Sequence, residues 1–319
     1  MTCRRHYFNY WSANTRRGGD QLMSRIIVAV FLSVLVSACS RTQLAYRNAD
    51  RLLEFYAGQT IDISAAQREQ WQPVLTDILK QHRDNELAYL VTYLDMASQT
   101  VSMDHNAVSA TCLSEYALTL SQRHAQLAVE LAVPLLVDLD QGQIEHLSEY
   151  MASRQDRLTE HYFDPDPQLR EKARRIRFNE RIEKWIGRMT SDQQLLVDEM
   201  LERIPDTSHF WLAYREQKNN DLLVMLEADV DAGSLRRYLN SWWVEWDGRS
   251  PDYIRSWQVA KQEFVIFIDR LGASLTSGQR ENLVKRLAAL REDLAEFLSP
   301  ESMPVSLSPP ASSCEASML

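Results

Sequence analysis

The chain is poor in glycine and lacks the short motifs that mark common enzyme sites. Its 319 residues include only 9 Gly. It contains no Gly-X-Ser-X-Gly elbow, glycine-rich phosphate loop or dinucleotide fingerprint, and neither His-Glu-X-X-His nor Cys-X-X-Cys occurs. These absences argue against nucleophile-elbow hydrolases, nucleotide-binding enzymes and zinc sites. We therefore expect no cofactor and no metal.

The sequence also lacks any window of sustained apolar-polar alternation, so we expect no sheet. Apolar residues recur instead at helical spacing, as in Trp71, Leu75 and Ile78. The scarcity of glycine favours helix throughout. The predicted fold is all-α, an elongated multi-helix bundle of helical hairpins.

Breakers and capping residues divide the chain into helices. Asp164-Pro165-Asp166-Pro167 is the clearest interior break, and two lobes would meet near 163–168 if the chain divides. The tail 299–319 holds seven Ser and four Pro among 21 residues, which predicts disorder. We expect helices over about 44–57, 64–102, 105–137 with a kink at Pro134, 140–162, 167–188, 190–203, 206–231, 233–246, 251–272 and 276–298.

Four of the expected helices begin with the same pattern, in which an apolar residue and a capping residue are followed three positions later by glutamine. The capping residue can accept the amide hydrogen of the glutamine, whose side chain can reach back to form a capping box. The unequal intervals between the boxes exclude a solenoid of one period, while two or three diverged hairpin units remain open. The capping and glutamine pairs are Ser64 and Gln67, Asp140 and Gln143, Thr190 and Gln193, and Thr276 and Gln279.

An export signal precedes the helical part. Arg25 is followed by ten largely apolar residues and then by Val36-Ser37-Ala38-Cys39. This pattern resembles a bacterial lipobox, which implies removal of residues 1–38 and acylation of Cys39. A true start at Met23 would give a signal of ordinary length. Ser40 in place of aspartate favours the outer membrane, with the protein facing the periplasm of a Gram-negative bacterium.

The chain after residue 38 is strongly acidic. The first 38 residues contain five Arg and one Asp, so 30 basic and 43 acidic residues remain, with a net charge of −13. Such a body repels nucleic acid, which we do not expect as a partner. We expect Cys112 to be a buried free thiol beside Tyr116, although a disulfide with Cys314 stays open.

Several stretches resemble an uncharacterised family of Gram-negative lipoproteins that is known as a domain of unknown function. The resemblance covers most of the chain after the lipobox and implies no reaction and no catalytic residue. A weaker similarity links Leu275-Thr276-Ser277-Gly278-Gln279 to the Leu-Thr-X-X-Gln motif of small periplasmic helical chaperones, although capping accounts for the same letters. The family resemblance rests on the lipobox, Leu44–Asp50, Arg181–Arg188 leading into the Thr190 box, and Phe210–Glu216 followed by Asp221-Leu222-Leu223.

A row of basic residues is the best candidate for a binding surface. Its members recur at steps of three or four, so they line one side of a helix. The row could bind phosphate-bearing headgroups or an acidic partner, or it could be a solvated face that pairs with the chain's own carboxylates. The members are Arg170, Arg174, Arg177, Arg181, Lys184 and Arg188.

The aromatic residues that gather between Tyr238 and Phe267 could stack on sugars or apolar peptides, but their spacing favours core packing. Trp243 would be the member to test for exposure. His146 and Glu149 could share a helix face, but two ligands do not make a zinc site. Carboxylate pairs at helical spacing are too many to nominate one.

The sequence therefore predicts an interaction, scaffold or chaperone-like module of the cell envelope, which acyl chains hold to the membrane and which has an envelope protein as its partner. The alternative is an envelope enzyme that acts on peptidoglycan through an unidentified carboxylate.

Overall fold

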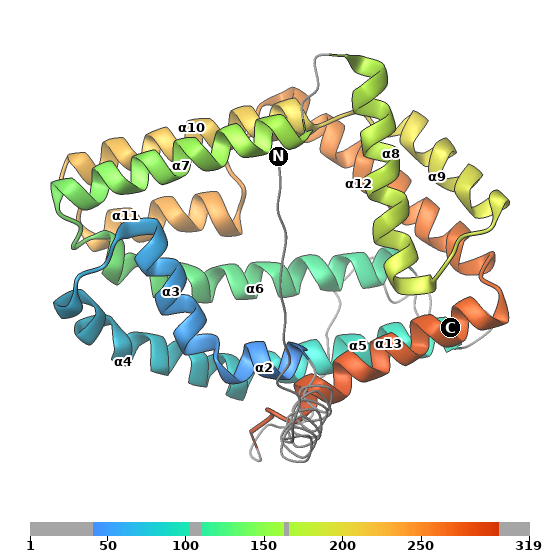
Figure 1. Cartoon of the computed structure of the whole chain (residues 1–319), viewed down its shortest axis with the longest axis horizontal. Helices are drawn as coiled ribbons and strands as arrows, with labels where there is room; N and C mark the ends of the chain where they lie inside the picture. Colours follow the sequence, from blue (N-terminus) through green and yellow to red (C-terminus); the bar gives the residue numbers. More distant parts are fainter. Residues whose placement is uncertain (1–40, 103–109, 163–165, 300–319) are drawn as a thin grey trace, which may run out of the picture. The chain divides into compact units, whose positions relative to one another are not determined.

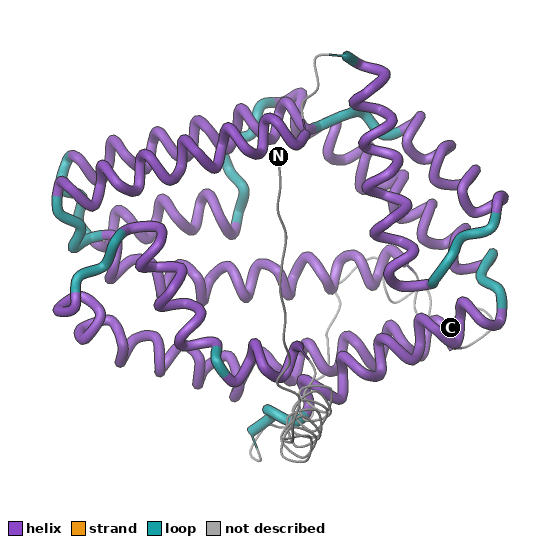
Figure 2. Tube along the Cα trace, in the orientation of Figure 1, coloured by secondary structure: helices purple, strands orange, loops and turns teal. Residues whose placement is uncertain are grey.

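A computed structural model describes residues 41–102, 110–162 and 166–299. The chain forms two compact units, and the boundary between them lies between Tyr46 and Arg47. In the first unit the described residues 41–46 are helical, and the second unit holds the remaining described residues. No strand occurs in the described ranges (Figure 2), so the expected all-α fold is confirmed. The predicted signal segment 1–38, Cys39 and residues 300–319 of the predicted tail lie outside these ranges.

The helices follow the expected ranges closely (Figure 1). The first expected helix is two helices, because the chain turns at Asn48. The expected helix 64–102 is one continuous stretch that contains a π-helical segment, η1. The elements are α2 (Arg41–Arg47), α3 (Ala49–Ile61), α4 (Ala65–Gln81), η1 (His82–Glu86), α5 (Leu87–Ser102), α6 (Ala110–Leu136), α7 (Gln141–Tyr162), α8 (Pro167–Ile186), α9 (Ser191–Arg203), α10 (Ser208–Glu227), α11 (Ala232–Leu239), η2 (Asn240–Val244), α12 (Pro251–Ala273) and α13 (Ser277–Ala295).

All four capping boxes form, and their glutamines pair. In the first pair, each side-chain amide of Gln67 and Gln143 donates to the other's carbonyl oxygen, at 2.9 and 2.8 Å. Gln193 and Gln279 make the same exchange at 2.8 Å in both directions. Each box satisfies the first turn of its own helix, while the exchanged bonds join two helix starts that are far apart in sequence.

Each glutamine amide also donates to a backbone carbonyl two residues before its partner's capping residue. In the second pair, Gln193 Nε2 donates to Ser274 O at 3.0 Å, and Gln279 Nε2 donates to Arg188 O at 2.9 Å. In the first pair the acceptors are Asp138 O and Asp62 O. The two pairs therefore share one arrangement with local two-fold symmetry.

The helices around the two pairs are arranged alike. Around the first pair, α3 packs against α7 and α4 against α6. Around the second, α8 packs against α13 and α9 against α12. In both groups the helix before the first box meets the helix after the second box. Two helices outside the groups each pack against a member of one of them: α5 lies along α13, and α10 lies along α7 (Figure 1).

Each four-helix group has its own core. One apolar cluster includes Leu75, Val129 and Leu147 together with residues of α10, α11 and η2. The other gathers Val197, Phe267 and neighbouring residues of α8, α9 and α12. Each fully buried Leu or Val stabilises the fold by roughly 1.5–3 kcal/mol, so these clusters hold the helices in place.

A small third cluster surrounds Cys112, which is 1% exposed and packs with Tyr116 and the partly buried Tyr93 and Met96. Cys112 is buried, as predicted. The prediction of a free thiol is wrong, because Cys112 is disulfide-bonded. The other cysteine of that bond, like the candidate Cys314, lies outside the described residues.

Candidate functional site

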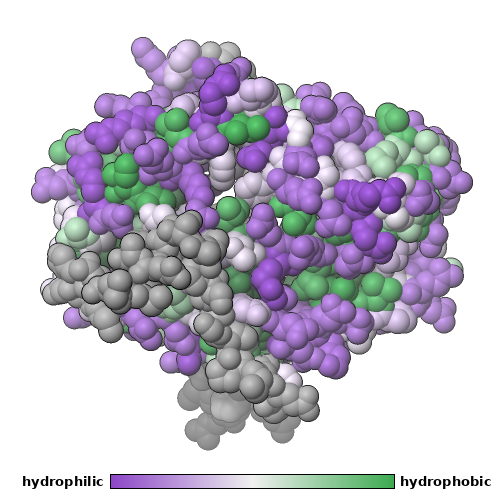
Figure 3. Space-filling model, turned by 180° about the vertical axis from the view of Figure 1, so that it is seen from behind, coloured by the Kyte–Doolittle hydropathy of each residue, from purple (hydrophilic) through white to green (hydrophobic). Residues whose placement is uncertain are grey.

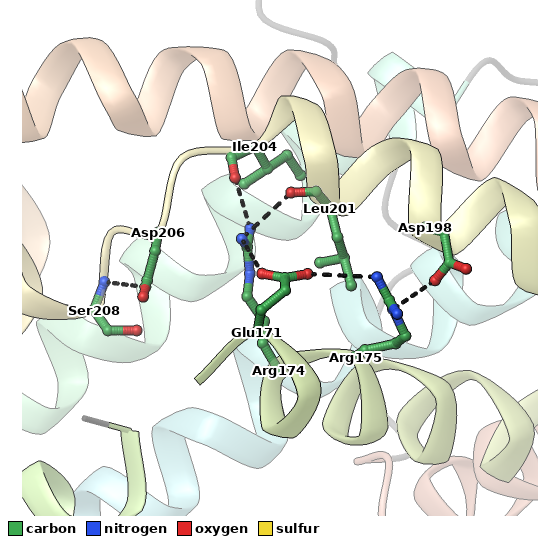
Figure 4. Close-up of polar contacts among 8 residues, drawn as sticks. All are labelled: Glu171, Arg174, Arg175, Asp198, Leu201, Ile204, Asp206 and Ser208. Carbon is green, nitrogen blue, oxygen red and sulfur yellow. Dashed lines mark hydrogen bonds and ion pairs between the residues drawn. The ribbon is translucent and has the colours of Figure 1, made fainter. Parts of the chain in front are cut away.

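The basic row lies on α8 except for Arg188, which follows the end of the helix, and Arg174 in the row is turned inward. Its side chain is 13% exposed and points at the end of α9 (Figure 4). There Arg174 Nη2 donates to Ile204 O at 2.9 Å and Nη1 to Leu201 O at 3.4 Å. These carbonyls belong to the last turn of a helix, where acceptors lack intrahelical partners and attract cations. Arg174 therefore caps α9 from outside, and burial lowers the pKa of its guanidinium.

Neighbouring acidic residues form ion pairs with the arginines at this contact between α8 and α9. Glu171 lies 3.7 Å from Arg174 Nη1 and 3.9 Å from Arg175 Nη2. Arg175, which is outside the predicted row, pairs through Nε with Asp198 Oδ1 of α9 at 2.7 Å (Figure 4). Asp206 accepts the Ser208 amide just beyond. Two arginines of α8 thus join it to α9, the inward Arg174 and the partly exposed Arg175.

The rest of the row divides in two. Arg170 and Arg177 are partly buried, and Arg177 Nη1 donates to His161 O at 3.4 Å while its guanidinium lies 5.1 Å from the Tyr162 ring centroid. The other three members are exposed: Arg181, Lys184 and Arg188. An external anion would meet these three, which lie in the second half of α8 and, for Arg188, two residues beyond its end.

A strained turn lies between η2 and α12. Trp246 adopts a left-handed φ of 58°, which is rare for a bulky residue and costs roughly 1–3 kcal/mol. Its indole Nε1 donates to Trp243 O at 3.0 Å, and its own carbonyl accepts from Arg249 Nε at 2.9 Å. Gly248 follows with φ 80°. These bonds hold a conformation that the local sequence would not adopt alone.

Lys218 of α10 lies beneath this turn. It is 7% exposed, and its Nζ lies 5.8 Å from the Tyr214 ring centroid and 5.3 Å from that of Tyr238, within the range of cation–π attraction. A Cβ at Gly248 would approach Nζ to 3.3 Å, so the turn needs glycine there. Tyr214 donates its hydroxyl to Asp247 O at 2.9 Å, and burial raises its pKa to about 12.

This packing sets the first turn of α12. Ser250 caps the helix by accepting the Tyr253 amide, and Pro251 occupies its first position. Tyr253 is buried and touches the rings of Phe210 and Tyr214, with centroids 6.1 and 6.0 Å away. The start of α12 is therefore fixed by aromatic contacts with α10.

The predicted core packing is confirmed for part of the aromatic group and is wrong for Trp257 and Phe264, which are exposed. Tyr253 and Phe267 are buried, and Trp242, Trp243 and Trp246 are partly buried. Trp243, the member to test for exposure, is only partly exposed, and the exposed aromatic residues lie on α12. Figure 3 shows on one face that hydrophobic residues reach the surface in patches between hydrophilic ones. On α12 the exposed large apolar residues on one side are Ile254 at 38%, Trp257 at 37% and Phe264 at 42%, here called the α12 ridge.

A second polar cluster lies where η1 meets α6. Glu86 is 7% exposed, and its oxygens accept from Arg123 Nε and Nη2 at 2.6 and 2.8 Å. Beside them His124 Nε2 lies 3.1 Å from His82 Nε2. Burial, followed by the neighbouring His124, lowers the pKa of His82 to about 4. The contact ties the π-helical segment to α6.

Neither cluster supplies a metal site. Over the described ranges no group of three or more His, Cys, Asp or Glu side chains could hold a metal ion. His146, which the sequence pairs with Glu149, instead has its Nε2 3.1 Å from Gln59 O of α3. Across the same ranges no helix is both long and apolar enough to cross a membrane.

Comparison with known protein families gives one match. A model described as "Family of unknown function (DUF6279)" matches residues 59–242, more than half of the chain. The chain belongs to this family. No curated protein and no solved structure matches the chain. The DUF6279 segment contains the Gln67 and Gln143 pair and Lys218, but it ends before the α12 ridge.

Proposed function

We propose that the protein is a lipid-anchored interaction module of the cell envelope that binds an apolar segment of a partner protein through the α12 ridge. The single observation that carries this proposal is the ridge itself. Three large apolar side chains stay 37–42% exposed on one side of a helix whose start is held by the contacts of Tyr253 with Phe210 and Tyr214. Exposed apolar patches on a rigid element are typical of protein-binding surfaces.

The compartment follows from chemistry at two cysteines. The lipobox supports acylation of Cys39 and attachment to the periplasmic face of the outer membrane, and the disulfide at Cys112 supports an oxidising compartment. When residues 1–38 are removed and Cys39 carries lipid, Cys314 is the cysteine of the sequence that remains to pair with Cys112.

The enzyme alternative finds no support at the buried carboxylate. Among the described residues Glu86 is the buried acidic side chain, and both of its oxygens are held by Arg123. It presents no free oxygen to a glycan, and it lies on η1 rather than beside the aromatic residues of α12.

Site-specific photo-crosslinking in living cells tests the proposal. A photo-reactive amino acid replaces Trp257 in one strain and Val224, 64% exposed on α10, in a control strain. We expect adducts from position 257 that are absent at 224. One or two stoichiometric partners would mark an assembly factor, whereas a broad set of unfolded outer-membrane proteins would mark a chaperone. If position 257 gives no protein adduct beyond the control, the proposal is wrong.

Alanine variants at the same two positions measure how much the ridge contributes to the affinity for the captured partner. Large apolar side chains at the centre of an interface commonly contribute about 2 kcal/mol or more, which is roughly 30-fold in affinity. Trp257→Ala should therefore weaken binding of the captured partner by about that factor, and Val224→Ala should leave it unchanged.

A further inference from the structure

A second exposed apolar surface lies on α3, close in sequence to the N-terminus. Leu52 is 40% exposed, Phe55 57% and Tyr56 58%. Their spacing places them on one face of the helix, and the Phe55 and Tyr56 rings meet edge to face with centroids 5.8 Å apart. These three residues are here called the α3 patch.

The opposite face of α3 is fixed in the fold. Leu53 and Ala57 pack on the larger core cluster, which also contains the buried Ile61. The helix packs against α4 and α7, and the contact between His146 and Gln59 O adds a polar tie. The α3 patch is therefore a surface presented by a docked helix and not the inner face of a helix that has come loose.

We infer that the α3 patch lies in the interfacial region of the membrane that holds the protein. This inference rests on the proposed acylation of Cys39. Leu52 follows Cys39 by 13 residues, and even a fully extended chain of that length reaches only about 45 Å. The helix α2 takes up seven of these residues and shortens the reach. The acyl anchor keeps the bilayer within range of the patch at all times, which raises its effective concentration there.

The chemistry of α3 suits a bilayer surface. Aromatic side chains and leucine on one face of a helix insert at the boundary between headgroups and acyl chains, and the tyrosine hydroxyl can remain among the headgroups. The charges along the helix are mixed, with Asp50 and Glu54 beside Arg51, so the helix itself adds no strong repulsion. The patch is too small to hold a protein on a membrane alone, but it can orient one that is already anchored.

Depth measurement by spin labelling tests the inference in the acylated full-length protein. Gln59 is exposed on the same face and lies outside the patch, so Gln59→Cys carries the label without altering the three residues. Val224→Cys carries the control label on α10. Labelling without reductant keeps the Cys112 disulfide closed. The proteins are reconstituted into liposomes of phosphatidylethanolamine and phosphatidylglycerol.

We expect the label at position 59 to lose accessibility to a water-soluble nickel chelate and gain accessibility to oxygen, while the label at 224 stays aqueous. Replacing Leu52, Phe55 and Tyr56 with Ser should return the label at 59 to an aqueous signal. If the labels at 59 and 224 give equal aqueous signals in protein that floats with the liposomes, the membrane inference is wrong, while the acyl anchor still stands. Failure to float would overturn the acyl anchor.

A lipid-free comparison separates the other occupants. The Gln59→Cys label is also read in a Cys39→Ala chain without liposomes, where we expect an aqueous signal. Protection of the label under those conditions would mean that a second copy or another part of the chain covers the patch, and the membrane assignment would be wrong.

Discussion

Replacing Gln193 with Leu should destabilise the protein far more than an ordinary glutamine substitution. Gln193 is 0% exposed, so water cannot take over its hydrogen bonds. Its loss leaves the Thr190 amide and the Ser274 carbonyl without this partner, and Gln279 loses one donor and one acceptor contact. Each buried polar group left unpaired costs about 1–3 kcal/mol, so the total should be about 3–5 kcal/mol.

Urea unfolding followed by far-UV circular dichroism measures this change as a shift of the midpoint at constant slope. Gln141→Leu is the matched control, since Gln141 is exposed and its side chain donates to Glu145 four residues on, a contact worth about 0.2–0.5 kcal/mol. Gln67→Leu should fall between them because Gln67 is partly exposed. If Gln193→Leu and Gln141→Leu differ by less than about 1 kcal/mol, the buried pair does not carry the stability assigned to it.

Three further predictions address other parts of the molecule. Because burial and His124 lower the pKa of His82 to about 4, below its unfolded value of 6.5, stability should be full above pH 6.5 and fall by about 1–2 kcal/mol between 6.5 and 4, after allowance for solvent screening. Urea midpoints across that window should show a smaller fall in His82→Asn. Cys39→Ala should move the protein from the membrane to the soluble fraction on cell fractionation, and continued membrane association would refute lipid anchoring. Arg174→Ala should lower the free energy of unfolding by about 1–3 kcal/mol, whereas exposed Arg181→Ala should change it by less than about 0.5 kcal/mol, as thermal melts of the two variants would show.

The helices could be predicted from the sequence because their signals are local. The capping residue, the glutamine three positions later and the apolar period together locate the start of α9 at Ser191 and of α13 at Ser277, within a residue or two of the expected ranges. Every capping box predicted from these letters forms. The helical spacing likewise predicted core packing correctly for Phe267, but not for Trp257 and Phe264.

Pairing between boxes could not be predicted, because capping uses only the side-chain carbonyl oxygen of each glutamine and nothing local says where its two amide hydrogens go. The π-helical segments were missed for a similar reason. One extra residue in a helical turn at His82–Glu86 leaves the apolar period almost unchanged. Arg174 shares the spacing of the exposed members of the row, and its contacts with the carbonyls at the end of α9 distinguish it from them.

The site on α12 was only partly visible in the sequence. The aromatic residues share one helical spacing, which does not distinguish the exposed Trp257 and Phe264 from the buried Phe267. A buried lysine among tyrosines has no distinctive spacing, since Tyr214 and Tyr238 lie on different helices. The one local hint is Gly248, which sits in a Gly-Arg-Ser-Pro turn.

The two glutamine pairs also govern how the chain can close during folding. They join residues 76 and 86 positions apart, so the entropy lost on closing the two loops differs by only about 0.1 kcal/mol. Each capping box is local and can form with its own helix in microseconds, whereas the exchange between amides must wait until distant helix starts meet. Four helices can thus be capped early, while the hydrogen bonds between the glutamine amides form late and then hold the distant helix starts together. Because the two glutamine pairs close loops of nearly equal length, loop-closure entropy does not favour one pair forming before the other.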